Sequence, residues 1–497
     1  MQYRKKQHNV KLLYRLVWCF LILSASGCAT VGQDYLRPEI SVSKSWNTRL
    51  GHGLSGDETD PQLMAHWWKT LDDPVLTGLI DRACKNNLDL KSAMARLRQA
   101  RAQRTAVKSG LFPWLDASGS ASRRRSSGDT GAGSSRTMYA AGFDADWEID
   151  LFGGVRRSVE AADADLSAAV EDVSDVLVSL NAEVALNYLD LRTYQVRLDV
   201  ARDNLAMQEE TFRLEQFRLD AGLSDELAVA QALANLESTR ARIPALNASV
   251  EGAKNRIAVL LGEQPGKLHE ELAACMPFPV APADVVVGVP ADVIRRRPDV
   301  RKAERELAAQ TARVGVAESD LYPKFTLNGS IGYEALSSAD LITAASRTWS
   351  YGPKITWPIF HAGSIRANIK VASALMEQAL IQYEKTVLAA LEDVEASITG
   401  YAEEQTRKES LENAAVAARQ AVDLAQDKYD AGLAGFDILL DAQRTLLTYE
   451  DELVVSKAAV ITHLISLYKA LGGGWTSLVH QGDTLSSFQG ETYDESE

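Results

Sequence analysis

Four stretches of the chain alternate between apolar and polar residues with a period of two, as strands with one apolar and one polar face do. In the first, small or apolar residues take the odd positions from Leu115 to Ala121, with polar residues between them. The others run from Tyr139 to Trp147, from Phe325 to Tyr333 and from Trp349 to Trp357, with aromatic residues toward their ends. The pattern is typical of barrel strands that face lipid on one side and a polar lumen on the other.

Long segments with helical periodicity surround these strands. We expect one helix from Pro74 to Ser109 and an uninterrupted helix from Gly154 to Asp220, followed by a turn at Gly222 and a helix to about Leu261. The long helix matches in length the two shorter ones laid end to end. An apolar residue every seventh position predicts a seam for coiled-coil-like packing, formed by Val184, Leu191, Leu198, Leu205, Phe212 and Leu219.

The second half of the chain repeats the first at a constant offset of 210 residues. Trp147 matches Trp357, and the turn from Asp220 to Leu223 matches the turn from Asp430 to Leu433. Because the offset is constant, every element has the same length in both copies. The predicted fold class is mixed α+β and mostly α, written as two tandem structural repeats.

The N-terminus has the order of an export signal. Basic residues from Arg4 to Arg15 precede an apolar run, small residues and Cys28. This junction resembles a bacterial lipobox, with Ala25 where Leu is usual, and the resemblance implies a lipidated Cys28 sorted to the outer membrane. An ordinary signal peptide cleaved nearby is the alternative. For Cys84 and Cys275, a disulfide stays open, although two separate buried thiols are favoured.

The punctuation by Pro, Gly and Ser predicts six parts of the chain. They are a lipoprotein signal peptide (1–27), an N-terminal anchored segment (28–73), repeat 1 (74–262), a proline-rich linker (263–298), repeat 2 (299–475) and a disordered acidic tail (476–497).

Charge and motifs exclude several classes of function. A formal net charge of −14 argues against a nucleic-acid partner, which requires clustered Lys and Arg. The histidines lack metal-ligand spacing, and no phosphate-binding loop or nucleophile elbow is present. We therefore expect no enzyme, no catalytic residues, no metal and no cofactor other than a covalent lipid on Cys28.

Four strands cannot close a barrel, and open strand edges are not viable in hydrocarbon. Two copies would supply eight strands, and side chains would fill the interior of such a barrel. Three copies would supply 12 strands and leave room for water. The polar faces favour the homotrimer.

Several motifs together resemble the TolC-like outer membrane factor family, in particular its lipoprotein branch with OprM, CusC and NodT. They are Trp67-Trp68, Asn87-Leu88-Asp89-Leu90, Trp147 to Gly153, Arg297-Pro298-Asp299, Trp357 to Gly363, Leu439 to Gln443 and Ala470 to Trp475. The resemblance implies a trimeric channel with a 12-stranded transmembrane β-barrel and a periplasmic α-barrel of long antiparallel helices. It would be the exit duct of a tripartite efflux or secretion system, together with a periplasmic adaptor and an inner-membrane transporter.

Candidate sites follow from the same resemblance. Adaptor contact is expected at the two turns, through Asp220, Gly222, Leu223, Asp430, Gly432 and Leu433, and a plain structural turn is the alternative. Asp441 falls where the family places an aspartate ring at the periplasmic gate, and Asp437 lies one helical turn earlier on the same face. Asp437 departs from the Leu of the OprM pattern and its counterpart is Leu227. Two solvated acids that cap or pair locally are the alternative.

A structural or adhesive outer-membrane lipoprotein without transport is the alternative function. The transported substrate, the pump class and the resting state, open or closed, are not readable from the sequence.

Overall fold

The computed structural model describes residues 30–39, 42–57, 60–130, 133–282 and 284–475. The predicted signal peptide, Cys28 and the acidic tail therefore lie outside the described residues. The described chain divides into two compact units. One holds a four-stranded sheet with the helical segments that adjoin its strands, and the other holds two long helical hairpins.

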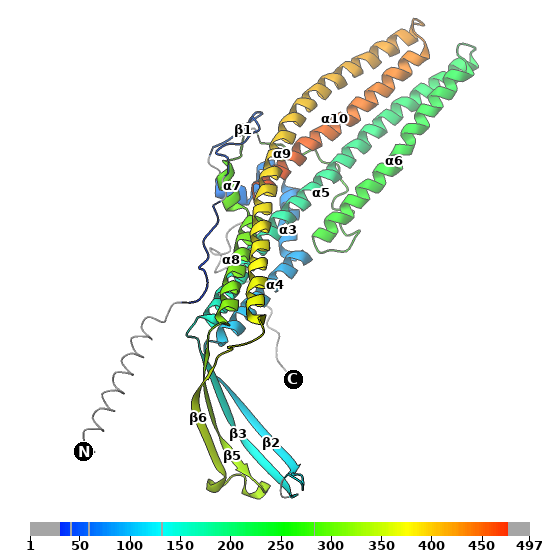
Figure 1. Cartoon of the computed structure of the whole chain (residues 1–497). Coiled ribbons are helices and arrows are strands. Elements are labelled where there is room, and N and C mark those ends of the chain that lie inside the picture. The colour runs from blue at the N-terminus through cyan, green and yellow to red at the C-terminus, as the bar shows by residue number, and fades with distance from the viewer. Residues whose placement is uncertain (1–29, 40–41, 58–59, 131–132, 283, 476–497) are drawn as a thin grey trace, which may run out of the picture. The chain divides into compact units, whose positions relative to one another are not determined.

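The sheet is antiparallel, with the strand order β2-β3-β5-β6 (Figure 1). Its strands are β2 (Trp114–Arg125), β3 (Ser135–Ile149), β5 (Lys324–Ala335) and β6 (Arg347–Thr356), and the short helices η2 (Ser338–Asp340) and η3 (Ala344–Ser346) lie between β5 and β6. All four alternating stretches of the sequence thus form strands. The register keeps their alternation in phase, because Asp144 pairs with both Asp116 and Ser330. One face of the sheet is polar and the other is apolar and aromatic.

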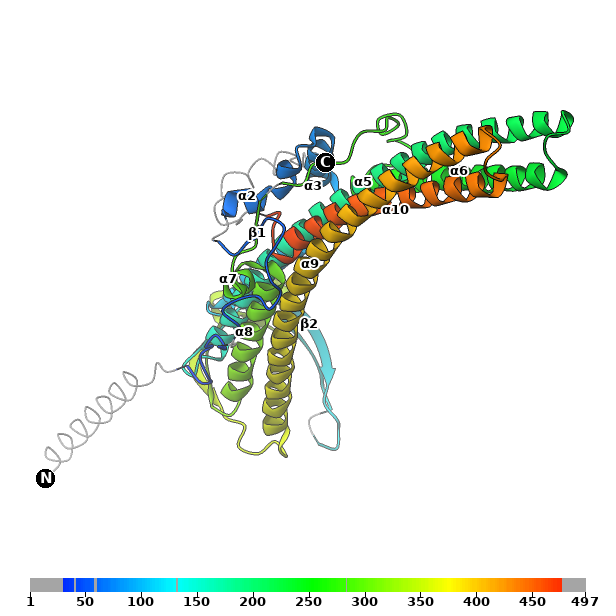
Figure 2. The same cartoon turned by 90° about the horizontal axis from the view of Figure 1, so that it is seen from above.

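Two helical hairpins of equal dimensions form most of the second unit (Figures 1 and 2). α5 (Gly154–Asp220) and α9 (Ser364–Asp430) each contain 67 residues, whereas α6 (Glu226–Leu260) and α10 (Phe436–Ala470) each contain 35. Among the described residues, α10 alone is long and apolar enough to cross a membrane. Its side chains Leu439 and Leu464 are fully buried, so packing explains its apolar character.

The expected helix from Pro74 to Ser109 is two helices, α3 (Pro74–Asn86) and α4 (Leu88–Ser109). Asn87 separates them in a non-helical conformation and caps α4, because its Oδ1 accepts from the Leu90 amide at 2.9 Å. Its Nδ2 also donates to the Leu260 carbonyl at 2.9 Å. A single helix would forfeit both bonds, which buried polar groups need.

The apolar seam predicted along α5 holds for only half of its length. Val184, Leu191 and Leu198 are buried, but Leu205, Phe212 and Leu219 are only half-buried. Toward the turn, the buried positions are instead polar: Asn204, Gln208, Thr211 and Glu215. The second hairpin presents hydrogen-bond partners to three of them, Asn204, Thr211 and Glu215, which an apolar pattern cannot reveal.

Short elements occupy the N-terminal segment and the linker. They are β1 (Leu54–Ser55), α2 (Pro61–Ala65), η1 (Trp67–Leu71), β4 (Val285–Val286) and α7 (Pro290–Arg296), and α8 (Pro298–Ser319) follows the linker. β1 and β4 pair in parallel. Both Cys84 and Cys275 are free; Cys84 is half-buried and Cys275 is exposed, contrary to the expectation of two buried thiols.

Three motifs from distant parts of the chain meet in the second unit: Trp67-Trp68, Arg297-Pro298-Asp299 and Ala470 to Trp475. Trp67 stacks on Tyr468 with ring centroids 5.2 Å apart, and Asn181 donates to the Gly474 carbonyl at 2.7 Å. The Arg297 guanidinium donates to the Ala470 carbonyl at 2.9 Å and to a carboxylate oxygen of Asp393 at 3.0 Å. These motif residues therefore join α5, α9 and α10.

Candidate functional site

The turns of the two hairpins have the same backbone geometry. In the first, the Leu223 amide donates to the Arg218 carbonyl at 2.7 Å, and in the second the Leu433 amide donates to the Lys428 carbonyl at 2.8 Å. Gly222 and Gly432 have φ of +74° and +71°, the left-handed conformation that closes a helix at low cost only in glycine. The predicted turn residues thus form matching helix ends.

Both turns expose an apolar residue beside an acid. Leu223 is 73% exposed and Leu433 is 80% exposed, and Asp220 and Asp430 are exposed as well. No atom lies within 4 Å of the position that a side chain on either glycine would take. The six residues predicted for adaptor contact are therefore accessible within this chain, as docking requires.

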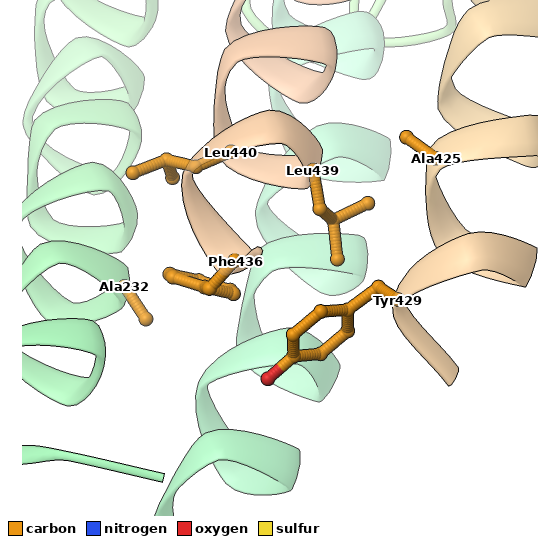
Figure 3. Close-up of a cluster of buried hydrophobic side chains, with 6 residues drawn as sticks. All are labelled: Ala232, Ala425, Tyr429, Phe436, Leu439 and Leu440. Atoms are coloured by element: carbon orange, nitrogen blue, oxygen red, sulfur yellow. The ribbon is translucent and has the colours of Figure 1, made fainter. Parts of the chain in front are cut away.

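The predicted gate residues lie on one exposed face of α10. Asp437 is in the first turn of the helix and Asp441 is one turn later, and both are exposed. Phe436, Leu439 and Leu440 point the other way, into a buried cluster with Tyr429, Ala425 and Ala232 of the neighbouring helices (Figure 3). The cluster holds the carboxylates on the opposite face.

Asp437 also has a local role at the start of α10. The corresponding helix α6 is capped by Asp225, the residue before its first turn, whose side chain accepts from the Ala228 amide at 2.8 Å. At the matching position, Gly435 has no side chain to cap α10, and Asp437 Oδ1 occupies the space that one would take. A carboxylate in the first turn stabilises the helix N-terminus, so Asp437 has this local role in addition to its exposed position on the face that it shares with Asp441.

The structure reveals a buried polar contact that the sequence analysis missed. The Tyr429 hydroxyl of α9 donates to Glu215 of α5, which is fully buried and also accepts from Ser224 Oγ at 2.8 Å. The Arg218 guanidinium lies 4.2 Å from the centre of the Tyr429 ring. Burial, and then the hydrogen bond to Glu215, raise the pKa of Tyr429 above its usual range. The hydroxyl therefore keeps its proton and donates.

Two further hydrogen bonds, both from α10, join the second hairpin to the first. Gln443 Nε2 donates to Thr211 Oγ1 at 3.0 Å, and Arg444 Nε donates to Asn235 Oδ1 at 3.1 Å. The available signal was the polar spacing of Asn204, Gln208, Thr211 and Glu215 by four, three and four residues. This spacing places the four side chains on one helix face.

The polar face of the sheet carries acids and amides in register. Asp144 Oδ2 accepts from Ser118 Oγ at 3.0 Å, Asp146 accepts from Asn328, and Ser330 bonds Ser350 at 2.8 Å. Even with these hydrogen bonds, charged carboxylates are costly in hydrocarbon. The polar face therefore needs water or protein against it.

An N-terminal strap, residues 30–37, is fastened to the helices beside the sheet. The buried Arg157 of α5 donates through Nε to the Val31 carbonyl at 3.0 Å and through Nη2 to the Gly32 carbonyl at 2.9 Å and Asp34 at 2.8 Å. The Arg37 guanidinium pairs with Glu304 of α8 at 3.0 Å. The strap begins two positions after Cys28, which lies outside the described residues.

Among the described residues, no group of three or more His, Cys, Asp or Glu side chains is placed to hold a metal ion. The sequence and geometry thus describe long paired helices, exposed turns and an amphipathic sheet.

Comparison with known proteins identifies the family. The family model "Outer membrane efflux protein" matches residues 79–263 and again residues 289–473. The chain belongs to this outer membrane efflux protein family. The double match confirms the tandem repeats, and the resemblance to outer membrane factors is confirmed with it.

Individual relatives agree over nearly full length. The chain is 32% identical to Nodulation protein T of Rhizobium leguminosarum bv. trifolii, covering 93% of this chain and 98% of the relative. It is 33% identical to the pyoverdine export outer membrane protein OpmQ of Pseudomonas aeruginosa, covering 93% and 97%.

A solved structure of the outer-membrane channel OprN matches with a TM-score of 0.84 at 37% identity, over 90% of this chain and all of that one. The predicted function, an outer-membrane channel for efflux, is confirmed by these matches, and the outer membrane is its location.

Proposed function

We propose that three copies of this chain assemble into a continuous exit duct, and that the four-stranded sheet of each copy contributes to a 12-stranded transmembrane barrel. One observation carries the proposal. The alternation of all four strands is in phase, while β2 and β6, at the ends of the strand order, pair on one side only among the described residues. Edges of this kind must be paired in lipid, and a further copy offers the complementary edge.

The polar face then lines an aqueous lumen and the apolar face meets lipid. Acids and amides on the polar face, such as Asp146 and Asn328, suit a water-filled interior. In each repeat, the two strands lie in the chain between a shorter helix and a long one. Both strands therefore join helices at the same end of the sheet, and this end faces the periplasm. The long hairpins supply the periplasmic α-barrel, with the repeat offset of 210 residues setting its pseudo-symmetry.

The duct is passive, and an inner-membrane transporter supplies the energy through a periplasmic adaptor. The adaptor docks at the turns, where Leu223 and Leu433 are exposed. In a trimer, Asp437 and Asp441 form two rings that narrow the periplasmic entrance and favour cations. Cys28 carries the lipid that anchors residues 28–73. The protein has no enzymatic activity of its own.

Reconstitution of the full chain in planar bilayers tests the proposal. Trimers that conduct ions, at least in variants opened at the gate, are expected. A trimer that never conducts would favour the structural or adhesive lipoprotein, which shares the helices and the anchor but needs no lumen. A monomeric, non-inserting protein would contradict the barrel itself.

A further inference from the structure

The apolar face of the sheet ends in arginines. The register places Arg123 and Arg125 of β2 on the same face as Leu115 and Ala117, because side chains alternate along a strand. Arg347 of β6, which pairs with Tyr333, lies on this face as well. All three arginines are exposed. They lie at the ends of the strands that are remote from the helices.

The distance along a strand from the end of the sheet that adjoins the helices to these arginines matches the length of a membrane-spanning strand. On β6, Ile355 and Arg347 are eight positions apart, and on β2, Leu115 and Arg123 are also eight positions apart. Eight steps along a strand span about 26 Å, and a membrane-spanning strand needs roughly 9–11 residues. The arginines therefore begin where the apolar band of a barrel ends.

No carboxylate balances these charges within the sheet. The residues paired with Arg123 and Arg125 are Thr137 and Ser135. The apolar face carries no Asp or Glu on any of the four described strands, and none of the three arginines forms an ion pair with a described residue. Unpaired cations beside hydroxyl groups are complementary to phosphate, which arginine can bind through two parallel hydrogen bonds.

We propose that Arg123, Arg125 and Arg347 bind the phosphate groups of the phosphorylated glycolipid in the outer leaflet of the outer membrane. The inference rests on the proposed function, which puts the apolar face in lipid and the ends remote from the helices outside the cell. Ser135 and Thr137 supply neutral donors to the same headgroup. Arg124 and Arg136, which pair directly on the polar face, point into the lumen and take no part.

Arg124 and Arg136 provide a matched control. R123Q/R125Q and R124Q/R136Q each remove two positive charges from the same pair of strands, but from opposite faces. The full-length protein, purified in detergent, is incubated with bisphosphorylated lipid A, and bound lipid is counted by native mass spectrometry. We expect R123Q/R125Q to bind lipid A at least about tenfold more weakly than wild type, with a further loss on adding R347Q. R124Q/R136Q should bind as wild type does.

Other outcomes overturn the lipid site. An equal loss in both double variants would indicate a general charge effect, and no loss in either would show that the arginines do not bind the lipid. Displacement of lipid A by inorganic phosphate alone would assign a free-anion site instead. Conductance is measured on the same preparations. A trimer that fails to conduct even in the gate variant Asp437→Ala/Asp441→Ala contradicts the proposed function, whereas a conducting trimer without bound lipid A contradicts this inference alone.

Discussion

Tyr429 and Glu215, 214 positions apart in the chain, meet in a buried hydrogen bond in which the tyrosine hydroxyl donates to the carboxylate. The bond joins the last turn of α9 to α5, one turn before the first hairpin closes. Apart from the hydroxyls of Tyr429 and Ser224, no hydrogen-bond donor among the described residues reaches Glu215. A buried carboxylate depends strongly on such donors, so this contact holds the two hairpins together near their turns.

Replacing Tyr429 with Phe should loosen the turns. The variant leaves Glu215 buried with one donor fewer, at a cost of about 1–3 kcal/mol. We expect faster amide hydrogen exchange in residues 215–224 and 429–436, measured by mass spectrometry. Tyr194→Phe removes a hydroxyl of α5 that makes no hydrogen bond with the described residues and should leave exchange unchanged. Unchanged protection in Tyr429→Phe would show that the bond does not hold the hairpins.

Removing the carboxylates of Asp437 and Asp441 should widen the periplasmic entrance and remove negative charge from it. In Asp437→Ala/Asp441→Ala, single-channel conductance should rise, and block by multivalent cations added on the periplasmic side should weaken, because the ring charges are gone. Asp437→Asn/Asp441→Asn, which keeps side-chain size, should weaken the block similarly.

Asp199→Ala/Asp203→Ala is the charge-matched control, since both acids are exposed on α5 at the same spacing. Its conductance should equal that of wild type. If the α10 variants also show wild-type conductance and block, then the two acids do not form rings and act only locally at the helix start.

A bulky residue at Gly222 should abolish efflux while trimers persist. The site is open, so the substitution causes no clash; it blocks docking and strains a backbone with positive φ. Gly266→Phe is the matched control, because Gly266 also has positive φ and open surroundings but lies in the linker. Efflux is measured by drug accumulation in cells. Similar efflux in Gly222→Phe and Gly266→Phe cells would argue against docking at the turn.

Cys28 should carry the lipid, and insertion of the barrel should not depend on it. Radiolabelled palmitate is expected to enter the wild-type protein but not Cys28→Ser, while both form trimers in the outer membrane. Cys84→Ser, which removes a half-buried thiol, should label normally. Palmitate label in the Cys28→Ser protein would contradict the assignment of the lipid to Cys28. Loss of trimers in this variant would show that insertion needs the lipid.

The ion pair between Arg82 and Glu263 should make stability depend on pH. The hydrogen bond from Arg82 lowers the pKa of Glu263. A lowered pKa stabilises the fold fully above the pKa of the unfolded chain, about 4.3, and this stabilisation is lost as the pH falls through the folded value. Arg82→Ala should therefore be less stable than wild type at pH 7, with the difference narrowing below about pH 4.

The measurement is the urea midpoint of unfolding at each pH. Lys85→Ala removes an equal charge from the exposed side of α3 and should show no such narrowing. If the difference in urea midpoint between Arg82→Ala and wild type stays constant from pH 7 to pH 3.5, the Glu263 carboxylate is not the source of that difference.

Local signals in the sequence were sufficient for the strands and the long helices. Period-two alternation depends on each strand alone, and the glycines at 222 and 432 mark turns by their own backbone freedom. The break at Asn87 was missed although Asn is a good helix cap, because the neighbouring residues on both sides favour helix. Whether a cap forms there depends on Leu260, which is distant in the sequence.

The polar contact between the hairpins could not be found in this way. Heptad spacing picked out Phe212 and Leu219, but the burial of Thr211 and Glu215 instead is set by Tyr429 and Gln443 of the other hairpin. The exposure of Asp437 and Asp441 on one face did follow from their spacing. Their arrangement in rings depends on further copies of the chain and stays a prediction.

The strap of residues 30–37 constrains the order in which the protein can fold. Tyr35 bonds Glu304, 269 positions later. Because an exported chain emerges N-terminus first, the strap and its first partner Arg157 of α5 are available long before its second partner, α8, has been delivered. Closing so long a loop is slow and entropically costly. Docking of the strap is therefore completed only after α8 has been delivered, and protection of residues 30–37 from protease would report that α8 is in place.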